Sequence, residues 1–266
     1  MAAGLSKRCP TGITGVDRAL NGGIPYTVAM VIGSEPGGGA REFVHSICAQ
    51  GSLMIKRKTP SSGNVVPPRT VTYLSLSKPR SDILLETSWL TSFREPLENH
   101  LTFFDLSSIY FGGEPTVTKW EGTVGPIDLV GQRNLLESLS QILNQIEPES
   151  LVVLDSIADL FSLKSPEFPQ LISFLKTLQI GTNRWRMVLL LLHSSGQLEE
   201  AQESAVLDAC DGAIHFSREA QQDGSSRYKL QLNHLRGIPV GMSGLERLFT
   251  VVTPAGMSVL DLQRVQ

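Results

Sequence analysis

The residues best suited to chemistry in this 266-residue chain lie in Val28–Phe43. The stretch has the sequence VAMVIGSEPGGGAREF, which is an apolar run, a glycine-rich turn and a helix-compatible segment. This order is typical of a loop that holds phosphate at a helix N-terminus, for which the pattern is G-x-x-x-x-G-K-S/T. If Gly39 is the last loop glycine, Ser34 replaces the first one. Ala40 then stands in the place of the lysine, and Arg41 in the place of the hydroxyl residue.

A second alignment of the same loop takes Gly33 as the first glycine. Gly39 and Ala40 then occupy the lysine and hydroxyl positions. In either alignment the loop lacks the ammonium group that grips the phosphate and the hydroxyl that holds magnesium. We therefore expect the chain not to be an ATPase, and we predict no metal site and no required cofactor.

Weak binding of ATP or another anion is a separate expectation. The Arg41 guanidinium can supply a bidentate phosphate contact in place of the lysine. Two alternatives stay open for Arg41, namely that it faces solvent or that it pairs with a nearby carboxylate. The backbone N–H groups that can cradle an anion at the start of the next helix are those of Gly37, Gly38, Gly39 and Ala40.

Asp155 is a second candidate, because it ends an apolar strand with the sequence LVVLD. An aspartate in this place can organise magnesium. The alternative is structural, with Asp155 capping the backbone N–H groups of Ser156 or Ile157. A later apolar strand, expected at 187–192, ends in the polar run His193–Gln197. Ligands of open α/β sheets lie at the carboxyl ends of the strands, so we expect these groups and the glycine loop at one edge.

The same polar run suggests a hydrolase nucleophile and base among His193, Ser194 and Ser195. However, adjacent residues at a strand end point in opposite directions, and no third group is evident in the sequence. The five histidines and three cysteines show no metal-ligand spacing. The sequence therefore favours neither a hydrolase triad nor a metal centre here.

The elements that must position these residues indicate an α/β fold. Apolar strands alternate with helices, which predicts a mainly parallel central sheet flanked by helices. The late strands follow one another directly and predict an antiparallel extension at the C-terminus. The helix after the glycine loop is expected at about 41–50, and strands at about 28–32, 70–76, 101–106, 151–155, 187–192, 212–217, 227–236, 247–252 and 257–262.

We expect residues 1–10 to be a frayed lead-in and residues 11–266 to form a single domain. Two long loops interrupt it, at 51–69 and 112–126, where proline, glycine and serine gather. The strongest helix signal covers 128–147, where apolar residues recur at three- and four-residue steps.

The composition is that of an ordinary globular protein, with 41% hydrophobic residues and a net charge of −3. No apolar run is long enough to cross a membrane and the N-terminus has no apolar signal core, so we expect a cytoplasmic protein without a membrane partner. Charge is uneven, since residues 1–80 hold 10 Lys or Arg against 3 Asp or Glu. The basic segment Lys56-Arg57-Lys58 is a candidate contact for nucleic acid, and a solvated loop is the alternative.

Two further motifs precede the glycine loop, TGITGVD at Thr11–Asp17 and NGGIP at Asn21–Pro25. They resemble the opening of KaiC- and RadA-like members of the RecA superfamily. The resemblance implies a RecA-like P-loop NTPase fold over nearly the whole chain. An archaeal branch of KaiC-like proteins, described as inactivated, is especially similar because its glycine loop also runs into A-R-E-F. The likeness continues at LVVLDS (151–156), MVLLLLHSSGQ (187–197), CDGAI (210–214) and LNHLRG (232–237).

The same resemblance implies one retained group and further losses in this chain. The retained group is Asp155, which corresponds to the Walker B aspartate that organises magnesium. Family members carry glutamates after the second strand, one of which activates water, whereas Leu76–Pro79 (LSKP) has no carboxylate. In the family's K-x-R-G segment, the lysine that reaches a neighbouring subunit's nucleotide is replaced by His234, while Arg236 is retained.

These losses predict a catalytically inactive RecA/KaiC-like protein that serves as a regulatory or scaffolding subunit, and the resemblance adds an association with signal transduction. We expect it to self-associate or to assemble with an active paralogue. Three alternatives stay open. They are an ATP-binding sensor or slow ATPase that uses Arg41, a nucleic-acid-binding recombinase paralogue of the RadA type, and a ring subunit like those of the Elongator complex.

Overall fold

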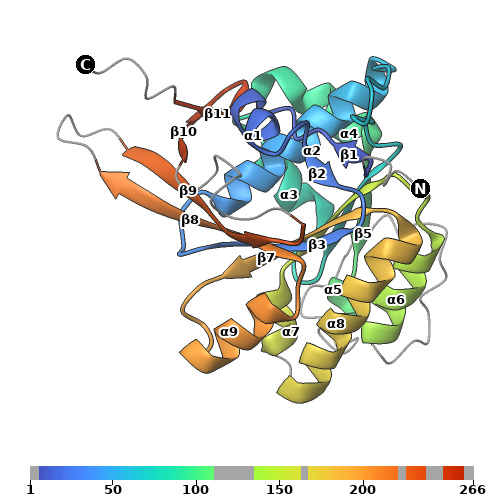
Figure 1. Ribbon diagram of the computed structural model, residues 1–266, viewed down its shortest axis with the longest axis vertical. Helices are drawn as coiled ribbons and strands as arrows, with labels where there is room; N and C mark the ends of the chain where they lie inside the picture. Colours follow the sequence, from blue (N-terminus) through green and yellow to red (C-terminus); the bar gives the residue numbers. More distant parts are fainter. Residues whose placement is uncertain (1–5, 111–134, 163–166, 221–225, 238–247, 261–266) are drawn as a thin grey trace.

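The computed structural model describes residues 6–110, 135–162, 167–220, 226–237 and 248–260. Within these residues one sheet contains nine strands, in the order β11-β10-β9-β8-β3-β7-β6-β4-β5 (Figure 1). The strands are β3 Val28–Ser34, β4 Val71–Ser75, β5 Leu101–Asp105, β6 Leu151–Asp155, β7 Val188–Ser194, β8 Gly212–Ala220, β9 Ser226–Leu235, β10 Leu248–Thr253 and β11 Gly256–Val259.

The sheet is parallel from β8 through β3 to β5 and antiparallel from β8 outward to β11. Parallel neighbours need long crossovers, which the helices supply, whereas β8 to β11 are consecutive strands that pair antiparallel with their neighbours. All seven residues of β3 are buried, as expected for a strand covered on both faces. The predicted mainly parallel α/β sheet with a C-terminal antiparallel extension is therefore confirmed.

Helices cover both faces of the sheet, with α1 to α4 on one side and α5 to α9 on the other (Figure 1). Alternate residues of β3 pack against the two helix layers. Ile32 lies in the core cluster beneath α2, and Val31 lies in the cluster on the opposite face. The helices are α1 Thr14–Ala19, α2 Ala40–Lys56, α3 Arg80–Glu86, α4 Arg94–His100, α5 Ser107–Tyr110, α6 Leu135–Gln145, α7 Ile157–Phe161, α8 Phe168–Trp185 and α9 Glu200–Asp208, with a 3-10 turn at Thr91–Phe93.

The N-terminal segment is more ordered than a frayed lead-in. Strand β1 (Arg8–Cys9) pairs antiparallel with β2 (Ile24–Pro25), so that expectation is wrong for these residues. Asp17 accepts hydrogen bonds from the backbone N–H of Thr11 at 2.7 Å and of Gly12 at 3.0 Å. The TGITGVD motif therefore closes a turn in front of α1 through its own aspartate.

Helix α2 is longer than the sequence suggested. It continues to Lys56, so the expectation of an exposed loop from residue 51 onward is wrong for 51–56. Gly51 is buried, and a Cβ placed on it would lie 2.9 Å from Val71 Cγ2 on β4. Glycine is a weak helix former and suggested a break, but here its missing side chain lets α2 pack closely on β4.

All the expected strands appear, with boundaries shifted by about one to three residues. The predicted loop at 112–126 lies outside the described residues. Helix α6 lies within the helix predicted at 128–147 and ends at Gln145, two residues before the predicted end, while 128–134 lie outside the described residues.

Candidate functional site

The carboxyl ends of β3, β6 and β7 bring the sequence candidates to one edge of the sheet. In the register of the sheet, Ser34 pairs with Ser194 and Ser75 pairs with Asp155. The backbone N–H of Ser195 donates to the carbonyl oxygen of Ser34 at 2.9 Å. The expected gathering of the glycine loop, Asp155 and the polar run is therefore observed.

The glycine loop packs against β9 and has a hydrogen bond within itself. Gly39 precedes α2 with a φ of 108°, a left-handed conformation that favours glycine. A Cβ placed on Gly39 would lie 2.7 Å from Tyr228 Cδ1 on β9. Residues 35–37 are exposed, and the N–H of Gly38 donates to the carbonyl oxygen of Glu35 at 2.8 Å. One of the four N–H groups expected to cradle an anion thus has a partner inside the loop.

Arg41 turns toward Asp155 and forms an ion pair with it. Its Nη1 donates to Asp155 Oδ2, and the same oxygen accepts a hydrogen bond from Tyr73 Oη at 2.6 Å. The Asp155 side chain is 4% exposed and the Arg41 side chain 34% exposed. Of the alternatives left open for Arg41, pairing with a nearby carboxylate is the one observed.

The alternative in which Asp155 caps the next residues is wrong. The N–H of Ser156 instead donates to Asp159 Oδ2 at 3.2 Å, and these two residues form a capping box at the start of α7. Because Asp159 takes the local role, the Asp155 carboxylate is available for partners on other elements.

The electrostatics of this cluster favour a charged guanidinium and a neutral phenol. Burial acts to lower the pKa of Arg41, but the Asp155 carboxylate more than offsets this and raises it. Burial and then the same carboxylate raise the pKa of Tyr73 well above its usual value. At neutral pH two donors therefore hold one carboxylate oxygen, in the place where a Walker B aspartate would organise magnesium.

A second carboxylate reaches the cluster from α3, and sequence reasoning missed it. Glu86 Oε2 lies 3.5 Å from Arg41 Nη1, and Glu86 Oε1 pairs with Lys78 Nζ. Lys78 belongs to the segment where the resemblance expects a glutamate. No sequence pattern marks Glu86, because its approach depends on where α3 lies relative to α2.

His45 lies one helical turn after Arg41 and is buried. Its Nε2 has no hydrogen-bond partner among the described residues. Burial, followed by the Arg41 charge, lowers the pKa of His45 to about 3, so the ring is neutral at physiological pH. The residues that line a cavity of about 300 Å³ beside it are Arg41, Glu42, His45, Glu86, Trp89, Tyr228 and Val252.

His234 and Arg236 lie at the opposite end of the sheet from this chain's glycine loop. Arg236 Nη1 is 2.7 Å from Asp211 Oδ1, and its Nη2 donates to the carbonyl oxygen of Thr27 beside the amino end of β3. His234 Nε2 is 3.4 Å from the carbonyl oxygen of Cys210. The structure does not bring these residues to the glycine loop of the same chain, and their contact with a neighbouring subunit stays a prediction.

The basic segment Lys56-Arg57-Lys58 lies at the C-terminal end of α2. Lys56 Nζ pairs with Glu95 Oε2 on α4, while Arg57 and Lys58 are exposed. Part of the positive charge is thus neutralised within the chain. Binding of nucleic acid to this segment stays a prediction.

The polar run that begins in the last residues of β7 has a partner that the sequence did not reveal. His193 Nε2 lies 3.3 Å from Glu203 Oε1 on α9. His193 at the end of β7 and Ser195 in the turn that follows line one cavity. Glu203 is thus a third group beside these residues, and it was not evident in the sequence.

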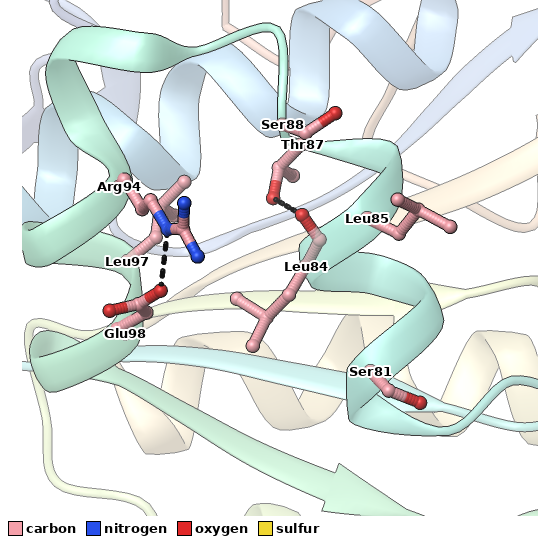
Figure 2. A pocket seen from close by; sticks show the side chains of 8 residues that line it. All are labelled: Ser81, Leu84, Leu85, Thr87, Ser88, Arg94, Leu97 and Glu98. Carbon is pink, nitrogen blue, oxygen red and sulfur yellow. Dashed lines mark hydrogen bonds and ion pairs between the residues drawn. The ribbon is translucent and has the colours of Figure 1, made fainter.

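Another cavity, of about 400 Å³, lies between α3 and α4 (Figure 2). Its polar groups bond to one another, since Arg94 Nε donates to Glu98 Oε1 at 2.9 Å and Thr87 Oγ1 to the carbonyl oxygen of Leu84 at 3.1 Å. None of these residues belongs to the Arg41–Asp155 cluster. This cavity gives no indication of chemistry.

The described residues contain no group of three or more His, Cys, Asp or Glu side chains arranged to hold a metal ion. Cys9, Cys48 and Cys210 are buried free thiols, and burial raises the pKa of each to about 12. Among the helices that the structure describes, none is long and apolar enough to cross a membrane.

Comparison with known proteins identifies the fold but not the activity. No protein-family model matches this sequence, and no curated protein matches it either. Because 592 solved chains match in structure, the fold by itself does not select one activity. One of them is the crystal structure of a KaiC-like protein from the hyperthermophilic archaeon Pyrococcus horikoshii OT3. It shares 15% sequence identity with a TM-score of 0.69, over 97% of this chain and 100% of the other. The chain therefore has a KaiC-like RecA fold, as the resemblance implied.

Proposed function

We propose that this chain is a non-catalytic RecA/KaiC-like subunit that regulates or scaffolds a larger assembly. The observation that carries the proposal is the ion pair between Arg41 and Asp155. In a working phosphoryl-transfer site a lysine contacts the phosphate and an aspartate organises magnesium. Here Arg41, at the start of α2, pairs with the aspartate in that place, so an internal contact occupies the group that would organise magnesium.

Magnesium would have to displace this contact in order to bind. Asp155 Oδ2 already accepts hydrogen bonds from Arg41 Nη1 and Tyr73 Oη. A metal ion beside the guanidinium would be repelled by about 4 kcal/mol for each pair of unit charges 4 Å apart near a protein surface. The pair therefore supports the loss of metal-assisted catalysis.

The segment in which the resemblance expects a water-activating carboxylate supports the same conclusion. The segment Leu76–Pro79 contains no Asp or Glu. Glu86 comes close from α3, but its two oxygens face Lys78 and Arg41. Because both oxygens are engaged by cations of the chain, neither is free to accept a proton from water, so Glu86 is a poor substitute.

Phosphate release from ATP and magnesium by the purified full-length protein tests the proposal. We expect no release above that of the Asp155→Ala variant, which removes the carboxylate and serves as the matched control. Saturable, magnesium-dependent release that disappears in this variant would contradict the proposal.

The proposed scaffolding role is supported by the fold, because the nine-stranded sheet and both helix layers are present although the glycine loop lacks the lysine and the magnesium-holding hydroxyl. We propose assembly with further copies of the chain or with an active paralogue, in a signalling role. Light scattering coupled to size-exclusion chromatography measures the mass of the chain alone and of its mixture with a paralogue. A monomer in both samples at every concentration would contradict assembly.

ATP or anion sensing is the second candidate, and one observation favours it. The Arg41 side chain is 34% exposed and lines a cavity of about 300 Å³ that also contains Trp89 and Tyr228. An anion can therefore approach the guanidinium from solvent. Thermal-shift titration with ATP, with and without magnesium, separates the candidates. A sensor is stabilised by ATP, loses this response in Arg41→Ala and keeps it in the exposed control Arg57→Ala.

A further inference from the structure

The cavity lined by His193 and Ser195 lies on the face of β3 that is turned away from α2. Its volume is about 320 Å³, and its lining comes from β3, β7, β8, β9, α9 and the segment after β7. Val31 lines it, whereas the Arg41–Asp155 cluster is on the α2 side of the sheet. The polar residues of the lining are His193, Ser195, Glu203, His215, Gln231 and Asn233.

Gly33 opens this cavity because it has no side chain. A Cβ placed on Gly33 would lie 3.7 Å from Ser195 Oγ and 3.8 Å from His215 Nδ1. Two polar side chains from different elements thus converge on one point above β3. The sequence connected Gly33 with the phosphate loop, but in the structure its open side is turned to this cavity.

His193 supplies a buried hydrogen-bond acceptor without a partner. The residue is 7% exposed, and its Nε2 lies 3.3 Å from Glu203 Oε1. The carboxylate accepts a hydrogen bond, so the proton of the neutral ring is on Nε2 and the lone pair is on Nδ1. Nδ1 has no hydrogen-bond partner among the described residues. Burial lowers the pKa of His193 despite the neighbouring carboxylate, which keeps the ring neutral.

A buried acceptor without a partner is costly, and native proteins rarely leave one unpaired. The cavity at His193 is lined by further polar groups from β8, β9, α9 and the turn after β7. A partner that the described chain does not supply is therefore expected at this atom. Such a partner must present an N–H or O–H donor.

The walls of the cavity define what fits. The lining contains no Lys or Arg and has one carboxylate, Glu203, so it disfavours an anion. Val31, Leu207 and Ala213 contribute an apolar wall. The exposed amides of Gln231 and Asn233 offer donors and acceptors at the rim. At the volume that one water occupies in the liquid, the cavity holds roughly ten non-hydrogen atoms.

We propose that this cavity binds a small uncharged heterocycle of nucleobase size, whose N–H donates to His193 Nδ1. The ring packs against the apolar wall, and the rim amides pair with its remaining donors and acceptors. The site lies on the other face of β3 from the Arg41–Asp155 pair, so it does not depend on the proposed function.

Titration of the full-length protein with adenine, cytosine and the anion orotate, followed by NMR of nitrogen-15-labelled histidine, tests the proposal. We expect adenine or cytosine to bind with a dissociation constant at or below about 1 mM and to shift the Nδ1 resonance of His193. We expect orotate to bind roughly tenfold more weakly or not at all, because the lining has no cation to meet its charge.

Gly33→Ala is the main variant, because its Cβ would be at ordinary contact distance from its neighbours and the fold can accept it. The added methyl fills the space between Ser195 and His215, so we expect roughly tenfold weaker binding. His193→Phe removes the acceptor and is expected to weaken binding to a similar extent. Ser194→Ala changes a neighbour that does not line the cavity, and it is expected to bind normally.

Three results would overturn the proposal. The first is the absence of saturable binding of either neutral probe up to about 10 mM. The second is binding by Gly33→Ala that equals binding by the unaltered chain, and the third is preference for orotate. A crystal grown with adenine that shows only water at His193 Nδ1 would lead to the same conclusion.

Discussion

Arg41 Nη1 on α2 donates to Asp155 Oδ2 at the end of β6, and Tyr73 Oη on β4 donates to the same oxygen. Three elements that are distant in the chain therefore meet at one carboxylate. This carboxylate lies at the sheet edge where α/β proteins bind their ligands. The ion pair at this edge should contribute to the stability of the fold.

Arg41→Met is expected to lower the free energy of unfolding by about 2 kcal/mol. The change leaves the buried Asp155 carboxylate with a neutral phenol as its remaining described donor, while the partial exposure of Arg41 moderates the loss. In a double-mutant cycle with Asp155→Ala, we expect a coupling of at least about 1 kcal/mol. Urea denaturation of the four proteins measures it.

Arg57→Met is the matched control for this cycle. Arg57 is exposed at the end of the same helix, so we expect a change within about 0.5 kcal/mol. If the effects of Arg41→Met and Asp155→Ala simply add, the ion pair makes no net contribution to stability.

Stability is expected to fall in acid because of His45. The pKa of its buried ring is lowered to about 3 in the folded chain, against about 6.5 in the unfolded chain. Above pH 6.5 both states are neutral and the residue adds no pH dependence. Below it, the unfolded state binds the proton and the folded state does not. The free energy of unfolding should then fall by about 1.4 kcal/mol per pH unit until the folded ring is also protonated.

His45→Phe is expected to remove this part of the acid slope. Urea denaturation at several pH values between 7 and 4 compares the slopes of the two proteins. The variant must first unfold cooperatively at pH 7.5, which shows that the core accepts the phenyl ring. Equal slopes would show that His45 is not the residue that takes up the proton on unfolding.

Gly51→Ala is expected to destabilise the protein by about 1–3 kcal/mol, although alanine is the better helix former by about 1 kcal/mol. The reason is that its Cβ would lie 2.9 Å from Val71 Cγ2. The double variant Gly51→Ala/Val71→Ala relieves this overlap. The Gly51→Ala change should therefore destabilise the Val71→Ala protein less than it destabilises the unaltered protein. A melting temperature raised by Gly51→Ala alone would refute the close packing of α2 on β4.

The three cysteines are expected to be unreactive in the folded chain. Cys9, Cys48 and Cys210 are buried, and burial raises the pKa of each thiol to about 12. The thiolate is the reactive form, so at pH 8 a thiol reagent should modify none of them until the protein is unfolded in urea. Rapid modification of any one under native conditions would show that its site opens to solvent.

Much of the fold could be predicted because apolar patterns report burial. The runs that became β3, β6 and β7 are apolar almost throughout, and a strand buried on both faces requires this. The polar residues that end them marked the carboxyl edge of the sheet. The helix boundary near Gly51 could not be predicted, because the preference of glycine for breaks was overridden by packing on a distant strand.

The sequence by itself determined the fold class, the sheet edge and the absence of the lysine and hydroxyl from the glycine loop. Only the tertiary structure decided that Arg41 pairs with Asp155, that Glu86 joins them and that Glu203 reaches His193. Periodicity reports which side of an element is buried, but it does not report which distant side chain lies opposite. That choice depends on how helices pack over strands, which for Arg41 and Asp155 joins residues 114 positions apart.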